Sequence, residues 1–172
     1  MLPRVLVCLV VVALSSFASA DDAEVKKTAK AQADKAQSAL LKGDYDTFIG
    51  FTHPKVVEKA GGRKKMSEML AAETKKMKAD GFAFKSAAIG DPSEPVKAGK
   101  ELYIAVPQGL EMTVPGGHLL VKGTLVGVST DGGKAWTFTD AAPGRDALKK
   151  FLPDLPDALV IPKKEPPKFV KD

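Results

Sequence analysis

The hydrophobic pattern of this chain changes at Gly81 from helical spacing to alternation. Before Gly81, apolar residues recur every three or four positions, which predicts long helices over residues 23–42 and 63–79 and short helices starting at Asp44 and Pro54. After Gly81, apolar and polar residues alternate, as they do in strands with one buried face. Helices followed by antiparallel strands predict an α+β domain, with the N-terminal helices packed on one face of a curved antiparallel sheet.

The alternating part is divided by residues that favour turns. It predicts five strands: the first begins at Phe82 and ends at the Gly90-Asp91-Pro92 turn, and the others lie at residues 102–106, 110–114, 118–128 and 136–138. A short helix is expected over residues 146–152, and the Lys/Pro-rich residues 162–172 are expected to form an extended tail.

Residues 1–20 have the layout of a secretory signal peptide. Arg4 supplies a positive start, residues 5–14 are apolar, and Ala18-Ser19-Ala20 is a small-x-small cleavage site. The apolar run is shorter than the roughly 18 residues that a membrane-spanning helix needs. We therefore expect cleavage near Ala20, export to the periplasm or the medium, no membrane span in the mature chain, and a single domain over residues 21–161.

Cleavage would remove Cys8, the only cysteine, and with it disulfides, thiolate metal sites and cysteine nucleophiles. Of the 26 basic and 21 acidic residues, only Arg4 lies in the first 20, so the other 152 residues carry 25 basic and 21 acidic side chains, a net charge of +4. Their only arginines are Arg63 and Arg145. Nucleic-acid readers rely on arginine forks and stacked aromatic side chains. No nucleic-acid partner is expected.

Beyond its fold class, the chain resembles the nuclear transport factor 2-like (SnoaL-like) family. The residues that carry the resemblance are Gly43-Asp44-Tyr45, Thr52-His53-Pro54 and Gly61-Gly62. Residues 129–138 and 159–162 add a likeness to uncharacterised secreted bacterial proteins of that kind. The resemblance implies a cystatin-like, nuclear transport factor 2-like cone, in which helices and a bent sheet enclose a pocket. It informs the fold far more than the function.

The most specific motif is Ser129-x-Asp131-x-Gly133-x-x-Trp136, which resembles the Asp-box of sialidase-like propellers. The carboxylate of such a motif accepts backbone N–H bonds across a turn, glycine permits a positive φ, and tryptophan covers the loop. A propeller needs several copies, and this chain has one. We expect a structural turn here, with a carbohydrate contact as the less favoured alternative.

Two histidines lie beyond the predicted signal peptide, His53 and His118, and neither has metal-ligand spacing. No metal site and no cofactor are expected. His53 stands before Pro54 at a predicted helix end, where the C-terminal dipole favours an imidazolium. The alternative is that His53 lies at the mouth of the pocket. His118 is expected to be exposed. We assign no catalytic residue, but His53 is the first candidate if the protein is an enzyme.

An acid–base enzyme would need a carboxylate or histidine in the pocket, with a tyrosine or a second acid close by. Glu101, Tyr103 and Glu111 are the polar candidates on the early strands. Alternation places the side chains of all three on the strand face opposite to that of their apolar neighbours, so they are expected to point away from the core. A β-bulge would reverse the parity of a strand.

Aromatic and apolar residues from both halves of the chain are expected to line the space between helices and sheet: Tyr45, Phe48, Met66, Leu70, Phe84, Trp136 and Phe138, with His53 at the mouth. Such a set forms either plain core or a small-ligand pocket. The leading hypothesis is an exported, non-catalytic module that binds a small amphipathic ligand or serves an envelope partner. The alternatives are a small acid–base lyase or isomerase, and a homodimer through the sheet face.

Overall fold

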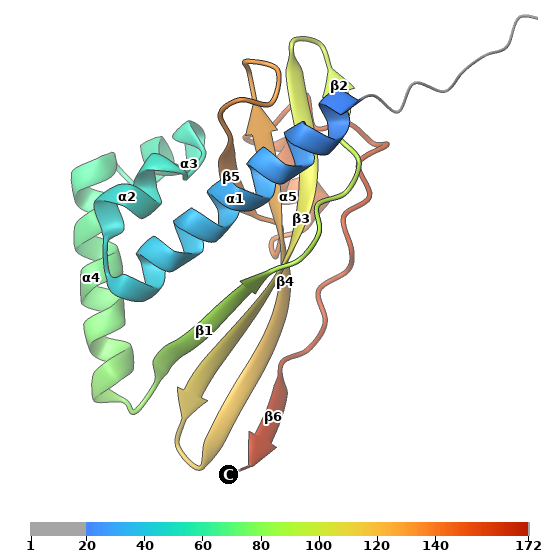
Figure 1. Ribbon diagram of the computed structural model, residues 1–172. Helices are drawn as coiled ribbons and strands as arrows, with labels where there is room; N and C mark the ends of the chain where they lie inside the picture. The colour runs from blue at the N-terminus through green and yellow to red at the C-terminus, as the bar shows by residue number, and fades with distance from the viewer. Residues whose placement is uncertain (1–19, 172) are drawn as a thin grey trace, which may run out of the picture.

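The computed structural model describes residues 20–171 and has an α+β fold, with helices packed on an open antiparallel sheet of six strands (Figure 1). Except for Ala20, the predicted signal peptide lies outside the described residues. None of the helices within residues 20–171 is both long and apolar enough to cross a membrane.

The helices come first along the described chain, as predicted. They are α1 (Ala20–Lys42), α2 (Tyr45–Gly50), α3 (Pro54–Lys59) and α4 (Arg63–Ala79). The later elements are β1 (Ala83–Ile89), β2 (Val96–Ala98), β3 (Glu101–Val114), β4 (Gly117–Ser129), β5 (Thr137–Asp140), α5 (Arg145–Lys149) and β6 (Lys168–Lys171).

The helix starts follow from capping and turn residues. The Asp44 carboxylate accepts a hydrogen bond from the Thr47 N–H (3.1 Å) and so caps α2. Pro54 is the first residue of α3. The N–H of this position has no partner within a helix, so proline, which lacks the N–H, costs no hydrogen bond there. Gly62 precedes α4 with a φ of 94°, a conformation that disfavours any residue with a Cβ. The predicted starts of these three helices are confirmed.

The sheet is built on one long antiparallel hairpin, β3 and β4, and each outer edge of this hairpin is shared by two strands. On one edge, β1 pairs with residues 108–113 of β3 and β2 pairs with residues 101–103. On the other, β5 pairs with residues 125–128 of β4 and β6 pairs with residues 117–120.

The separate strands predicted at residues 102–106 and 110–114 are one continuous strand, β3, so this prediction is wrong. Pro107 lies in its middle. The Pro107 C=O accepts a bond from the Gly90 N–H (2.8 Å), on the edge that carries β1 and β2. Because the N and C=O of a residue in an antiparallel strand point to the same side, the missing N–H of Pro107 faces this edge as well. No bond to β4 is lost, and the strand continues.

One face of the hairpin is covered by α1, which crosses the sheet obliquely (Figure 1). Ala29 and Ala33 are fully buried, so their small side chains let the helix lie close to the strands. We call the resulting cluster the helix-side core: Val25, Ala29, Ala33, Ile104, Val106, Leu125, Trp136 and Phe138.

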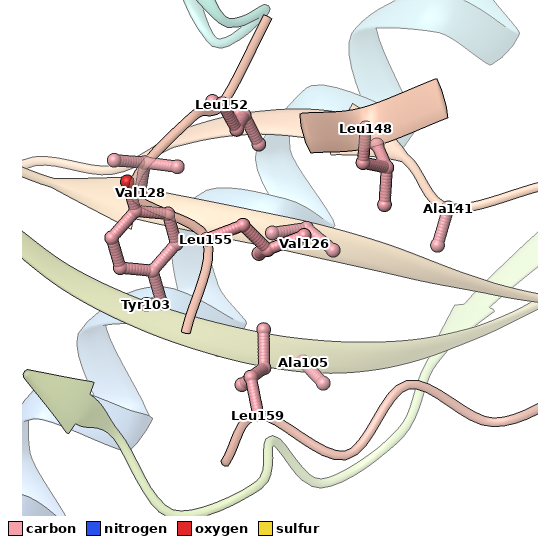
Figure 2. Close-up of a cluster of buried hydrophobic side chains, with 9 residues drawn as sticks. All are labelled: Tyr103, Ala105, Val126, Val128, Ala141, Leu148, Leu152, Leu155 and Leu159. Atoms are coloured by element: carbon pink, nitrogen blue, oxygen red, sulfur yellow. The ribbon is translucent and has the colours of Figure 1, made fainter. Parts of the chain in front are cut away.

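The opposite face is covered by the C-terminal residues 141–161. Figure 2 shows the cluster formed there, the outer core: Tyr103, Ala105, Val126, Val128, Ala141, Leu148, Leu152, Leu155 and Leu159. The hairpin is therefore buried on both faces along part of its length. The sheet face considered for a homodimer is not exposed in this region.

Tyr103 corrects a prediction. It lies on the face opposite Ile104, as alternation requires, but it is only 1% exposed, because the C-terminal residues cover that face. Its hydroxyl donates to the Glu101 carboxylate. Burial, with this bond and the charge of Glu101, raises the pKa of Tyr103.

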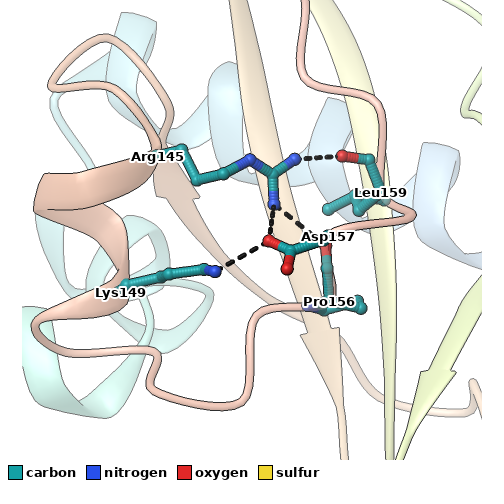
Figure 3. Close-up of polar contacts among 5 residues, drawn as sticks. All are labelled: Arg145, Lys149, Pro156, Asp157 and Leu159. Atoms are coloured by element: carbon teal, nitrogen blue, oxygen red, sulfur yellow. Dashed lines mark hydrogen bonds and ion pairs between the residues drawn. The ribbon is translucent and has the colours of Figure 1, made fainter.

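Arg145 holds the C-terminal residues in place (Figure 3). Its guanidinium donates to the backbone oxygens of Pro156 (2.9 Å) and Leu159. It also lies 3.7 Å from the Asp157 carboxylate, which accepts a shorter bond from the Lys149 ammonium (2.7 Å). The hydrogen bond from Lys149 is the main cause that lowers the pKa of Asp157.

The predicted tail ends in a strand. Residues 162–167 are neither helix nor strand, and β6 then pairs with the start of β4. All four residues of β6 are exposed. Lys122 of β4 also forms an ion pair with Glu165 (3.1 Å). These contacts place the end of the described chain along the hairpin.

Replacing Arg145 by Met is expected to lower the free energy of unfolding by about 1–3 kcal/mol, because two backbone oxygens lose a charged donor. Urea denaturation measures the loss. The matched variant Lys149→Met removes only an exposed ion pair and is expected to cost less than about 1 kcal/mol. Equal losses in the two variants would contradict the role given to Arg145.

Candidate ligand-binding cavity

A cavity of about 420 Å³ lies between the helices and the sheet. All four N-terminal helices and strands β1, β3, β4 and β5 contribute to its wall. The wall is mostly apolar, with Leu40, Phe48, Phe51, Met66, Phe84 and Phe138 among its larger side chains. Ligand pockets in proteins have volumes of about 300–1,000 Å³ and mainly apolar linings. The cavity has the size and character of a small-molecule site.

The cavity begins where the close packing of α1 ends. Ala29 and Ala33, near the middle of the helix, lie against the sheet in the helix-side core. One to two turns later, Ala36, Gln37 and Leu40 line the cavity instead. The helix thus seals one end of the space and forms a wall at the other.

Two glutamines form a buried hydrogen bond on the cavity wall. The Gln37 amide N–H of α1 donates to the Gln108 side-chain oxygen of β3 (2.7 Å), and the two residues are 6% and 8% exposed. The Gln37 oxygen Oε1 is buried and has no hydrogen-bond partner among the described residues. A buried acceptor left unpaired costs about 1–3 kcal/mol. The pair joins α1 to the sheet, and the Gln37 oxygen remains without a hydrogen-bond donor.

Three charged residues line the cavity: Lys55 and Lys59 of α3, and Asp140 at the end of β5. All three are exposed, so their charged groups lie at the rim. The Asp140 carboxylate accepts a bond from the Ala142 N–H (2.7 Å). Neither lysine forms an ion pair with any residue in the described range 20–171. The rim therefore carries two unpaired positive charges and one carboxylate that is already hydrogen-bonded.

The residues predicted to bind a ligand are divided between the cavity and other places. Phe48, Met66 and Phe84 line the cavity, as does Phe138. Tyr45 and Leu70 are half-buried and lie outside the lining.

Trp136 is buried in the helix-side core and belongs to the loop between β4 and β5. The Asp131 carboxylate accepts bonds from the N–H groups of Lys134 and Ala135, and from the Ser129 hydroxyl. These bonds, that of Ala135 first, lower the pKa of Asp131. The Trp136 indole N–H donates to the Gly133 carbonyl (2.9 Å). The motif is the structural turn that the sequence predicts, and its tryptophan is not available to stack on a sugar.

His53 lies at the N-terminus of α3 rather than at a helix C-terminus. Its Nδ1 accepts a bond from the Lys55 N–H (3.3 Å), which requires a neutral ring. Burial and the charge of Lys55 lower the pKa of His53, against a smaller opposing effect of Glu101. The predicted imidazolium is therefore wrong. His53 is also absent from the cavity lining.

The other acid–base candidates lie elsewhere. Glu111 accepts bonds from Lys85 (2.9 Å) and Ser86 (3.0 Å) of β1, which lower its pKa. Glu101 binds the buried Tyr103 hydroxyl. His118, expected to be exposed, is half-buried. The cavity lining contains one carboxylate, Asp140, and no histidine or tyrosine. No three His, Cys, Asp or Glu side chains within residues 20–171 are grouped so that they could hold a metal ion.

Neither glutamine was predicted from the sequence to be a site residue, although each leaves a signal there. Gln108 stands at the alternating positions of Ile104, Val106 and Leu110, where a polar residue is unexpected. Gln37 follows Ala33 by four positions and so lies beside the apolar stripe of α1. A polar residue on each of two facing apolar surfaces is the pattern that marks this site.

A smaller cavity of about 280 Å³ adjoins this one. Residues 162–165 of the tail line it, together with residues 121–124 of β4, the segment between the stretches that pair with β5 and β6. It shares Gln108, Leu110 and Asp140 with the larger cavity. The tail thus lies next to the proposed ligand site.

Replacing Gln108 alone by Met is expected to lower the free energy of unfolding by about 1–3 kcal/mol, because the buried Gln37 amide N–H loses its acceptor. The double variant Gln37→Met, Gln108→Met removes both polar partners and is expected to regain most of that loss. Urea denaturation of the three proteins measures both changes. A double variant that is less stable than the single variant would show that the two side chains do not pair.

The stability of the protein is expected to fall as the pH drops below about 6.5, the pKa of an unfolded histidine, towards the lower pKa of folded His53. In that interval the unfolded chain binds the proton and the folded chain does not. His53→Asn keeps a capping acceptor without a titrating ring. Urea denaturation at pH 7.5 and 5.5 should therefore show a smaller loss in the variant. The same pH dependence in both proteins would assign the effect to other groups.

No protein-family model, no curated protein and no solved structure matches the chain. The function must therefore be inferred from the cavity itself.

Proposed function

We propose that this protein is an exported, non-catalytic module that binds a small amphipathic ligand in the cavity between the helices and the sheet. The observation that carries the proposal is the cavity itself, with its volume of about 420 Å³, its apolar wall and its few polar groups. Binding pockets combine these three properties.

The size of the cavity argues against plain core. Side chains that form only core are close-packed, whereas the side chains of this wall leave a hollow that opens to solvent at the rim. Phe48, Phe51, Phe84 and Phe138 all contribute to the wall, yet they leave the space between them open. A ligand that fills the space would supply the contacts that these rings lack.

The proposed fold is the cone of the nuclear transport factor 2-like family. Helices followed by a long antiparallel hairpin, with a cavity between the two layers, support it. The signal-peptide layout of residues 1–20 supports export.

A binding module agrees better with the cavity than a lyase or isomerase does. Acid–base catalysis requires a positioned proton donor or acceptor within hydrogen-bond reach of the substrate. His53 is engaged in capping α3, and Asp140 accepts a backbone bond. The wall therefore offers a place to hold an apolar molecule rather than a pair of groups to transfer its protons.

Filling the cavity tests the proposal. Ala36 lines the cavity and is 3% exposed, so Ala36→Phe is expected to place a ring in the ligand's space. The variant should bind the neutral fluorescent probe N-phenyl-1-naphthylamine at least about tenfold more weakly than the unchanged protein, because about 1.4 kcal/mol of apolar contact suffices for that factor. Fluorescence titration measures the affinity.

The matched control is Ala71→Phe, which makes the same substitution on the exposed surface of α4. It should bind the probe as the unchanged protein does. A second cavity variant, Val56→Phe, gives an independent reading if Ala36→Phe does not fold. The proposal fails if both folded cavity variants bind the probe normally, or if the unchanged protein does not bind it.

A further inference from the structure

We infer that the ligand is an amphipathic anion with an apolar body of about ten to fourteen carbons, whose head group is held by Lys55 and Lys59 at the rim. This inference rests on the proposed function and specifies its ligand. Three observations carry it: the apolar wall, the two lysines and the volume.

The two lysines are placed to act on one group. They stand four positions apart on α3, so they project from the same face of the helix, and both line the cavity. Like charges at this spacing destabilise a helix. An anion bound between the two ammonium groups replaces their mutual repulsion with attraction to the shared negative charge.

No described residue of the protein supplies that anion. Several other lysines are paired across the fold, for example Lys30 with Asp91 (2.7 Å) and Lys85 with Glu111 (2.9 Å). Lys55 and Lys59 have no such partner within residues 20–171, although Glu58 lies between them in sequence. Glu58 does not line the cavity, and the Asp140 carboxylate already accepts a backbone bond.

The apolar wall determines the chemical character of the ligand beyond its head group. Behind the lysines, the cavity is bounded by aromatic and aliphatic side chains of α1, α2, α4 and the sheet. A cationic or uniformly polar molecule would lose its hydration there without gaining partners. A molecule with one charged end can instead leave that end at the rim and bury the remainder.

The volume limits the length of the apolar body. A methylene group occupies about as much space as a water molecule in the liquid, about 30 Å³. At that volume per group, a cavity of about 420 Å³ holds at most about fourteen methylene groups with the head group outside, so a ten-carbon chain fits within it. Each methylene buried should raise the affinity about three- to fourfold until the cavity is full.

The experiment is a displacement titration of the full protein, with N-phenyl-1-naphthylamine as the reporter. The competitors share one decyl chain and differ in the head group: decanoate, decyl phosphate, 1-decanol and decyltrimethylammonium. We expect decanoate or decyl phosphate to bind at least tenfold more tightly than the alcohol, and the cation to bind least. The two anions distinguish a free carboxylic acid from a phosphate-headed lipid fragment as the source of the head group.

The lysines are tested by Lys55→Gln/Lys59→Gln. This variant should lose the preference for the anions while its affinity for 1-decanol stays within about twofold. The matched control, Lys75→Gln/Lys78→Gln, makes the same change in net charge on exposed positions of α4 and should keep the preference. Octanoate and hexanoate should each bind more weakly than decanoate.

The outcomes separate the two proposals. If the alcohol binds as tightly as the anions, or if the α3 double variant keeps the preference, the inferred head group is wrong while the binding site stands. If Ala36→Phe also leaves every affinity unchanged, the cavity is not the site and the proposed function fails with it.

Discussion

The structure depends on burial of the β3–β4 hairpin on both of its faces. Ile104 and Val106 face α1, whereas Tyr103 and Ala105 face the C-terminal residues, and all four are buried. A strand stretch of this kind stays in place only if two separate segments cover it. The helices supply one cover and residues 141–161 the other, with Arg145 fixing the second through two backbone oxygens. The fold is thus a sheet held between an N-terminal and a C-terminal layer.

The cavity follows from the uneven size of the side chains in the helical layer. Ala29 and Ala33 bring the middle of α1 onto the sheet, and the glutamine pair joins the following turn to β3. Between that pair and α2–α4, the aromatic side chains form a wall without filling the space that they enclose. The layer that stabilises the hairpin therefore also leaves a site beside it, and α3 adds positive charge at its rim.

Much of the fold could be predicted from the sequence because its signals are local. Asp44, Pro54 and the change of period at Gly81 mark helix starts and the transition to strands, and the Ser129–Trp136 turn follows from its own residues. The continuous β3 was missed because the direction of the Pro107 nitrogen depends on the neighbouring strands. Tyr103 was misplaced because the cover over it comes from residues some fifty positions later in the chain. Alternation reports which residues share a face, but not what lies on that face.

The same limit applies to the site. Phe48, Met66 and Phe84 could be predicted as lining because they are large and apolar on elements that face each other. Gln37 and Gln108 leave a signal only as polar residues at apolar positions, and the two lysines leave none, because their meaning depends on the packing that brings them to one cavity. Binding in the cavity is tested most directly by methyl NMR of Met66, which lines it, with exposed Met69 as an internal reference. On titration with an amphipathic monocarboxylate, the Met66 methyl signal should shift and show magnetisation transfer to the ligand, while the Met69 signal stays unchanged. Equal shifts at both methionines, or none at Met66, would contradict binding in the cavity.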